Sequence, residues 1–387
     1  MIELKETTQN TSFERITDSI LEYCEDKGYG LAIWTLPHSE IRHLLVCYSP
    51  IKTRTEKLES LKSGFVINAF ETQTGGEKIY LEADVYFTFT DNVELNNKIK
   101  EVFSDFILNP IEKNHEIHLP KVTEAEQQDY LELISKAVSE INKGNFKKLV
   151  LARKKTASVS GKISPGKILE NALKKYKNTF NSISFTPEYG TWLGASPETL
   201  VCRNADQIFK TVALAGTQHA EGKSEKEAAW SQKEIEEQAY VSKFIVERLK
   251  KIRLREFEDI GPKTVRIGHL FHLKTEFIVD LKEVEFPDLV SDMLEMLHPT
   301  SAVCGMPKEE AMEFVLANEN FSRELYSGYL GPVNIGHETH IFVNLRCIKI
   351  KGSEVSFYAG AGITEDSVPQ KEFTETEYKM ESLLNCF

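Results

Sequence analysis

The chain has 387 residues, of which 41% are hydrophobic and 27% charged, and its formal net charge is −12. This length allows one large domain or two average ones, and the composition excludes wholesale disorder. The acidic balance argues against nucleic acid as a partner, because phosphate binding uses clustered Lys and Arg. We expect no secretory signal and no membrane span, since no run approaches the roughly 18 apolar residues that cross a bilayer.

Six cysteines are spread along the chain without a CxxC pair. Scattered thiols in apolar surroundings are typical of reduced, packed side chains rather than of a disulfide framework or a zinc site. The sequence therefore predicts a cytoplasmic protein.

The first part of the chain predicts two helices around several short strands. Thr11 and Glu14 fit a capping box, and apolar residues at helical spacing predict a helix that ends at Gly28. Strands are expected over 31–36, 43–48, 65–70 and 79–90, followed by a helix over 93–108. Residues 109–122, with two prolines and mixed charge, are expected to form a connection.

The second part begins with another capping box, Thr123 and Glu126, which predicts a helix to about Lys143. A strand is expected from residue 148, and Ser164 with Pro165 predicts the start of a further helix. The later elements are strands near 182–185, 199–202, 207–212 and 265–278, helices over 224–251, 288–297, 308–317 and 369–384, and a hairpin of 340–350 with 355–358. Strands and helices come in clusters rather than in alternation, which favours an α+β fold with largely antiparallel sheets.

Residues 161–167, GKISPGK, match the spacing of a Walker A phosphate loop. However, Ile168 stands where Ser or Thr should hold magnesium, and Pro165 removes one amide from the phosphate cradle. A turn with a helix cap is the better interpretation.

Two Glu-x-x-Glu pairs fall on predicted helices. Glu234 and Glu237 lie on the long middle helix, and Glu372 and Glu375 lie on the last one. A spacing of three places each pair on one helix face, so two such faces could offer four carboxylates to a hard cation such as Mg²⁺. On spacing alone, solvated helix faces are the commoner explanation, because Glu is abundant on exposed helices.

Nine short blocks in the second part carry the strongest functional signal. They are KLVLAR (148–153), GASPETL (194–200), ALAGT (213–217), KEIEEQ (233–238), LHPTSAVCG (297–305), RELYSGYLG (323–331), NLRCIKI (344–350), YAGAGI (358–363) and KEFTETEYK (371–379). In order and spacing these blocks resemble the chorismate-utilising enzymes, which include isochorismate, salicylate, anthranilate and aminodeoxychorismate synthases. The first 120 or so residues carry little of the resemblance.

The resemblance implies an anthranilate synthase-type fold, in which two largely antiparallel sheets pack together with helices outside. We expect a single domain over 1–387, with 1–120 as a divergent N-terminal part and 121–387 as the catalytic chorismate-binding region.

The resemblance also implies a catalytic pair. Water-using members of the family have Lys at the position of Lys148, where ammonia-using members have Gln. A lysine acts as a base only in its neutral form. Glu198 would be the partner acid that protonates the departing hydroxyl, which requires a raised pKa of the kind that burial produces. We expect the two side chains on opposite faces of the substrate ring, not joined as an ion pair.

Two alanines distinguish among the reactions of the family. Aminodeoxychorismate synthases often carry a nucleophilic Lys at the position assigned here to Ala213. Members that eliminate pyruvate or use ammonia tend to have Thr at the position of Ala302. Alanine at both positions favours release of isochorismate.

Metal and substrate roles follow from the same resemblance. Glu237 and Glu375 are expected to bind Mg²⁺ directly, and Glu234 and Glu372 through water. Arg346 is expected to clamp the enolpyruvyl carboxylate with two parallel hydrogen bonds. The other expected substrate-pocket residues are Lys379, Gly360, Gly362, Ala302, His272 and Thr217.

The chain also departs from the family pattern. Gln238 stands where the family often has His, and Pro332 follows Gly331 where an aromatic residue is frequent. Neither position coincides with the expected acid, base or metal ligands.

The sequence thus predicts an isochorismate synthase, an isomerase that depends on Mg²⁺ and adds water at C2 of chorismate while the C4 hydroxyl leaves. The expected ligands are chorismate and isochorismate, and the product would feed menaquinone or a catechol siderophore. We expect a monomer without a glutaminase subunit. The alternatives are a salicylate synthase, an anthranilate synthase component I and a binding protein without catalysis.

Overall fold

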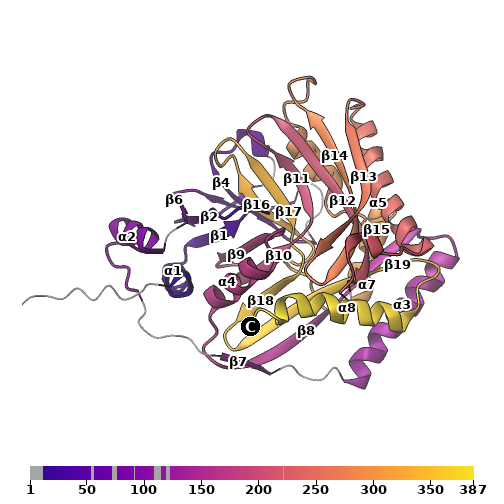
Figure 1. Ribbon diagram of the computed structural model, residues 1–387, viewed down its shortest axis with the longest axis horizontal. Helices are drawn as coiled ribbons and strands as arrows, with labels where there is room; N and C mark the ends of the chain where they lie inside the picture. Colours follow the sequence, from indigo (N-terminus) through magenta and orange to yellow (C-terminus); the bar gives the residue numbers. More distant parts are fainter. Residues whose placement is uncertain are drawn as a thin grey trace, which may run out of the picture.

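Two large antiparallel sheets form the centre of the computed structural model, which describes residues 12–53, 56–71, 76–90, 92–108, 115–118, 123–220 and 222–387 (Figure 1). The first sheet contains β1 (Gly30–Thr35), β2 (Arg42–Cys47), β6 (Val85–Phe89), β7 (His115–His118), β8 (Lys148–Gly161), β9 (Phe180–Thr186), β10 (Gly190–Ser196), β15 (Gly305–Met306), β18 (Cys347–Lys351) and β19 (Glu354–Ile363). Its strand order is β15-β8-β19-β18-β10-β9-β1-β2-β6, and β7 also pairs with β8.

The second sheet contains β3 (Ile51–Thr53), β4 (Gly64–Asn68), β5 (Lys78–Glu82), β11 (Thr199–Arg203), β12 (Ile208–His219), β13 (Glu258–Ile267), β14 (Leu270–Asp280), β16 (Tyr329–Val333) and β17 (Thr339–Val343). Its order is β13-β14-β12-β11-β17-β16-β4-β5-β3. The helices are α1 (Phe13–Lys27), α2 (Asn92–Val102), α3 (Glu124–Asn142), α4 (Pro165–Lys175), α5 (Gln232–Lys251), α6 (Leu289–Leu297), α7 (Lys308–Asn318) and α8 (Pro369–Leu384), with short 3₁₀ turns η1 (Leu58–Ser60) and η2 (Glu225–Glu227). The predicted α+β class with two antiparallel sheets is confirmed.

The sheets pack face to face, and helices cover their outer faces. Between the sheets lies an aromatic-rich core in which Phe180 of β9 stacks on Phe342 of β17, with ring centroids 4.2 Å apart. Helices α1, α2 and α4 pack on the outer face of the first sheet, α3 and α7 with α8 cover its β8–β19 end, and α5 and α6 cover the second sheet. Each fully buried apolar side chain contributes roughly 1.5–3 kcal/mol, so these four packed regions contribute strongly to the stability.

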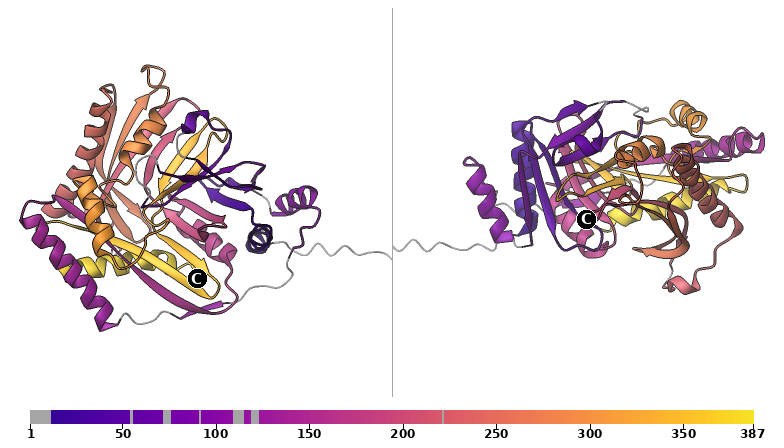
Figure 2. Two further views of the ribbon diagram at one scale, coloured as in Figure 1. Left: turned by 180° about the vertical axis from the view of Figure 1, so that it is seen from behind. Right: turned by 90° about the horizontal axis from the view of Figure 1, so that it is seen from above.

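The N-terminal strands extend both sheets rather than forming a sheet of their own. Strands β1, β2 and β6 continue the first sheet from β9, and β3, β4 and β5 continue the second sheet from β16. Figure 2 shows this indigo part at one side of the molecule, opposite α5.

Several predicted element boundaries are confirmed. Thr123 and Glu126 form the expected capping box of α3, and Ser164 caps α4 through the Lys167 amide. Thr11 lies outside the described residues, and the side chain of Ser12 caps α1 instead. The amide of Gly166 donates to Asp18 of α1 at 2.8 Å, so the Walker-like segment is packed against a helix rather than open to a phosphate.

Four predicted elements are wrong in their bounds. The strand expected over 79–90 is two strands, β5 in the second sheet and β6 in the first, and the helix expected over 93–108 ends at Val102. The helix expected over 224–251 begins only at residue 232, because Ser231 and Glu234 form a capping box that starts α5 there. The strand expected over 340–350 is broken at 344–346, where the chain leaves β17 in the second sheet and enters β18 in the first. Arg346 has φ +46° at this break, a backbone conformation that ends regular strand pairing.

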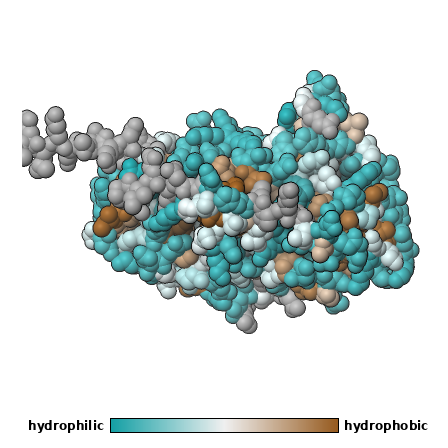
Figure 3. Space-filling model, turned by 90° about the horizontal axis from the view of Figure 1, so that it is seen from below, coloured by the Kyte–Doolittle hydropathy of each residue, from teal (hydrophilic) through white to brown (hydrophobic). Residues whose placement is uncertain are grey.

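Among the residues that the structure describes, no helix is long and apolar enough to cross a membrane. On the face drawn in Figure 3, hydrophilic side chains predominate and apolar ones form small separate groups.

Candidate active site

Two neighbouring chain crossings between the sheets create the site. One joins β10 to β11 and contains Glu198, and the other joins β17 to β18 and contains Arg346. The flanking strands are paired, with Gly194 opposite Cys347 and Thr199 opposite Phe342. Because the two crossings lie side by side along these paired strands, Glu198 and Arg346 reach the same pocket.

This pocket brings together most of the residues predicted from the sequence. Its walls include eight of them: Glu198, Thr217, Glu237, His272, Ala302, Arg346, Gly360 and Lys379. We call it the chorismate-block pocket, after the sequence blocks that line it. Lys148 and Gly362 lie next to Glu237 but do not line this pocket. Glu234, Glu372 and Glu375 line an adjoining pocket, and Thr217 lines both.

Glu198 has the environment that a general acid requires. It is 3% exposed, and its Oε1 accepts a hydrogen bond from the Thr300 hydroxyl at 3.4 Å. Burial raises the pKa of Glu198 to about 7, although the nearby Lys148 charge and this hydrogen bond pull the pKa down. A carboxyl with this pKa holds its proton in a large fraction of molecules at neutral pH, which agrees with the sequence-based requirement.

Lys148 is completely buried at the start of β8 and pairs with Glu237 rather than with Glu198. Its ammonium donates to Glu237 Oε1 at 2.8 Å. Burial opposes the charge on Glu237, but the charge and hydrogen bond of Lys148, together with the charges of Lys379 and Lys233, outweigh burial and lower the Glu237 pKa. Glu237 thus contacts the expected base while also lining the pocket.

Gly362 leaves room for this ion pair. A Cβ at position 362 would lie 2.5 Å from Glu237 Oε1 and 3.1 Å from Lys148 Cε. We predict that Gly362→Ala lowers kcat by at least about tenfold, because the displaced carboxylate takes Lys148 out of position. Its melting temperature should change little, since the clash meets side-chain ends rather than backbone. Steady-state kinetics beside a thermal melt check this, and wild-type kcat in the variant contradicts it.

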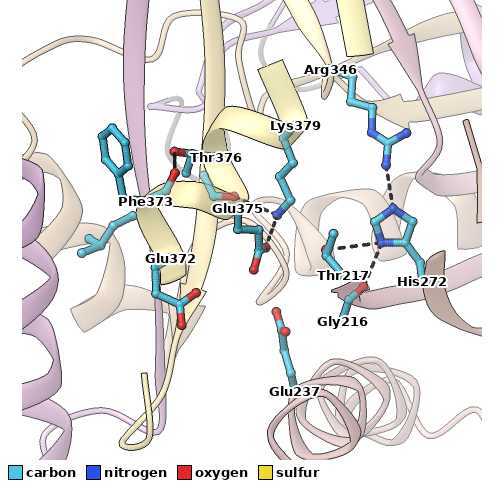
Figure 4. Close-up of polar contacts among 12 residues, drawn as sticks. Gly216, Thr217, Glu237, His272, Arg346, Glu372, Phe373, Glu375, Thr376 and Lys379 are labelled. Carbon is cyan, nitrogen blue, oxygen red and sulfur yellow. Dashed lines mark hydrogen bonds and ion pairs between the residues drawn. The ribbon is translucent and has the colours of Figure 1, made fainter. Parts of the chain in front are cut away.

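Arg346 is held by His272, as Figure 4 shows. Burial, and then the charge of Arg346, keep the His272 pKa well below its ordinary value, so the ring is neutral. Its Nε2 accepts from Arg346 at 2.6 Å, and its Nδ1–H donates to the Gly216 carbonyl at 2.8 Å. Burial lowers the pKa of Arg346 to about 10, which leaves the guanidinium charged at neutral pH. His272 therefore orients the cation that the sequence assigns to a substrate carboxylate.

The four predicted metal ligands lie on two helices that meet beside the pocket. In Figure 4, Glu237 projects from α5 toward Glu375 of α8. Glu375 accepts from Lys379 at 2.8 Å, and Glu372 pairs with Lys233. Glu234 caps its own helix, since its carboxylate accepts the Ser231 amide at 2.7 Å.

The donor set suits Mg²⁺, which takes carboxylate oxygens and retains several waters. Glu372 is 1% exposed, and its Oε2 has no hydrogen-bond partner, so a buried acceptor is available for a cation or its water. As the side chains stand, no three His, Cys, Asp or Glu residues of the described chain are close enough to hold a metal. A cation could be held by these side chains only if Glu237, Glu372 and Glu375 exchanged their lysine partners for the ion.

The structure adds two residues to the sequence-based picture. Tyr326, from the RELYSGYLG block, lines the pocket and stacks on Tyr358 with centroids 5.5 Å apart. Ala213, chosen as the position of a nucleophilic lysine, lies in the core beneath α5, whereas Ala215 of the same block lines the pocket. The side chain that would carry such a nucleophile is thus at 215, and it is also alanine.

Comparison with known proteins agrees with this geometry. A family model described as chorismate binding enzyme matches residues 3–387. Isochorismate synthase MenF of Bacillus subtilis (strain 168) is 24% identical over 362 residues, which cover 91% of this chain and 76% of that protein.

Two solved structures share the fold. A Bacillus anthracis protein described as a 2,3-dihydroxybenzoate-specific isochorismate synthase, DhbC, superposes with a TM-score of 0.74 at 23% identity, covering 95% of this chain and 99% of that chain. Anthranilate synthase component I of Streptococcus pneumoniae TIGR4 superposes with a TM-score of 0.63 at 17% identity, covering 91% and 89%. The predicted anthranilate synthase-type fold is confirmed.

Proposed function

The chain belongs to the chorismate-binding enzyme family, and on that basis we propose that it is an isochorismate synthase. One observation carries the choice of reaction: buried Glu198, with a pKa of about 7, shares its surroundings with a buried lysine, Lys148, that does not pair with it. A water-adding isomerase needs a proton donor and a proton acceptor at separate positions on the ring. Ala302 in the pocket wall supports release of isochorismate.

In the proposed reaction Lys148 first loses its proton to solvent as its ion pair with Glu237 is released, and the neutral amine then accepts a proton from the water that adds at C2. Glu198 donates its proton to the hydroxyl that leaves C4 as water. One water enters and one leaves, so the product is an isomer of the substrate. Arg346, oriented by His272, holds the enolpyruvyl carboxylate. Glu237 and Glu375, with Glu234 and Glu372 acting through water, would hold Mg²⁺, which would supply positive charge for the ring carboxylate.

Product identification tests the proposal. Purified protein, Mg²⁺ and chorismate should give isochorismate as the main product by chromatography. Salicylate with an equal amount of pyruvate would instead identify a salicylate synthase, and anthranilate fluorescence that depends on added ammonium would identify an anthranilate synthase component I. Binding of chorismate without turnover at any Mg²⁺ concentration would support a binding protein.

We propose that the product, isochorismate, feeds the synthesis of either menaquinone or a catechol siderophore. The solved relatives are named for menaquinone and for 2,3-dihydroxybenzoate, and both names describe isochorismate synthases. With the reaction we propose a cytoplasmic monomer that works without a glutaminase subunit.

A further inference from the structure

Positive side chains hold the carboxylates where α5 and α8 meet. Lys148, the proposed base, contacts Glu237 in the wall of the chorismate-block pocket, and Lys379 lines that pocket as an expected substrate-binding residue. Lys233 lies outside that pocket, in the adjoining one, and pairs with Glu372. The proposed reaction gives Lys233 no role.

The position of Lys233 is informative because its ion pair spans the two metal-binding helices. Lys233 lies in the first turn of α5, four residues before Glu237, and Glu372 lies in the first turn of α8, three residues before Glu375. The pair of Glu375 with Lys379, in contrast, stays within α8. The contact between Lys233 and Glu372 thus ties together the helices that supply the predicted ligands.

The buried carboxylate of Glu372 has a positive charge beside it, the ammonium of Lys233. Glu372 is 1% exposed, and one of its oxygens accepts from Lys233. An ionised carboxylate that is buried this deeply is favourable only beside a cation.

We propose that Lys233 is a built-in substitute for the metal, which neutralises Glu372 and ties α5 to α8 until Mg²⁺ takes over that carboxylate. The inference rests on the proposed function, because only there are the four glutamates metal ligands. An ammonium group and a divalent cation repel each other at a shared carboxylate, so Mg²⁺ enters by displacing Lys233. Competition between Lys233 and Mg²⁺ for Glu372 therefore sets the metal affinity, although Lys233 is not itself a metal ligand.

Calorimetric titration of the full chain with MgCl₂, in the absence of chorismate, tests this exchange. Lys233→Met should bind Mg²⁺ about tenfold more tightly than wild type, since a competing charge is gone. Lys243→Met, which removes an exposed lysine from the same helix, should bind as wild type does. Unchanged or weaker binding by Lys233→Met overturns the proposal, and weaker binding would show a lysine that supports the metal.

A double-mutant cycle separates the ion pair from a general field effect. In a Glu372→Gln background, Lys233→Met should no longer tighten Mg²⁺ binding, and an equal gain there overturns the pairing. Without metal, Lys233→Met should melt below wild type, and Mg²⁺ should restore the difference. Lys233→Gln provides the same comparison if the Met variant folds poorly, because Lys233 is partly exposed.

These measurements and product identification can fail independently. A protein that makes a product other than isochorismate leaves the metal titration unaffected. Wild-type protein and variants that all fail to bind Mg²⁺ overturn the inference, while the product assay still tests the reaction.

Discussion

Lys148→Ala is expected to convert chorismate at least about 100-fold more slowly than wild type, because the proposed reaction loses its only assigned base. The effect should fall on kcat, since Lys148 acts on the attacking water rather than on substrate binding. Mg²⁺ binding should be no weaker than in wild type, because the substitution frees Glu237 from its ion pair. Initial rates of isochorismate formation, with calorimetry for Mg²⁺, measure both effects.

A neighbouring lysine provides the matched control for this variant. Lys147 precedes Lys148 on the chain but is exposed, so Lys147→Ala should keep wild-type kinetics. A Lys148→Ala protein that folds, binds Mg²⁺ and retains more than about a tenth of the wild-type rate would remove Lys148 from the mechanism. Lys148→Met, which preserves more of the buried volume, separates loss of the amine from loss of packing.

Much of this site could be predicted because the short sequence blocks that resemble the family also contain the expected site residues. Eight of the thirteen predicted site residues line one pocket, although they come from strands in both sheets and from two helices. The raised pKa of Glu198 could also be predicted, because the role implied by the family resemblance demands a protonated carboxyl.

The predictions that failed depended on tertiary structure. Residues 340–350 read as one strand because both halves are apolar, yet the chain changes sheets at Arg346. Periodicity describes which face a residue occupies, and it carries no information about which sheet the strand joins. The same limit explains Ala213 and Ala215, which share a face of β12 but differ in whether α5 or the pocket covers them.

The partner of Lys148 is the third feature that sequence could not supply. The sequence argument required that Lys148 avoid Glu198, and the structure places Glu237 beside it. The sequence predicts Glu237 as a metal ligand, so the expected base, Lys148, and an expected metal ligand are in direct contact. Pairings of this kind arise where β8 and α5 meet, 89 residues apart in the chain, and no local pattern predicts them.

Replacement of the acid should have an effect as large as replacement of the base. Glu198→Gln cannot donate a proton, so kcat is expected to fall at least about 100-fold. In wild type, kcat/KM should fall as pH rises through about 7, because Glu198 then loses the proton that the leaving hydroxyl requires. A pH–rate profile checks this, and a wild-type rate that stays level above neutrality would take Glu198 out of the acid role.

The same substitution should stabilise the protein above neutral pH. The Glu198 pKa is about 7 in the folded chain and 4.5 in the unfolded reference, so folding keeps a proton that the unfolded chain releases. Below about pH 4.5 both states are protonated and no penalty exists. Between about pH 4.5 and 7 the unfolded chain releases the proton while the folded protein keeps it, so stability falls across this range and the penalty is complete above about pH 7. Glu198→Gln removes that charge, and its free energy of unfolding should exceed that of wild type by about 2–3 kcal/mol near pH 8 and by much less near pH 5. Urea unfolding at the two pH values measures the difference, and a gap that does not depend on pH would show that burial of Glu198 is not what holds its proton.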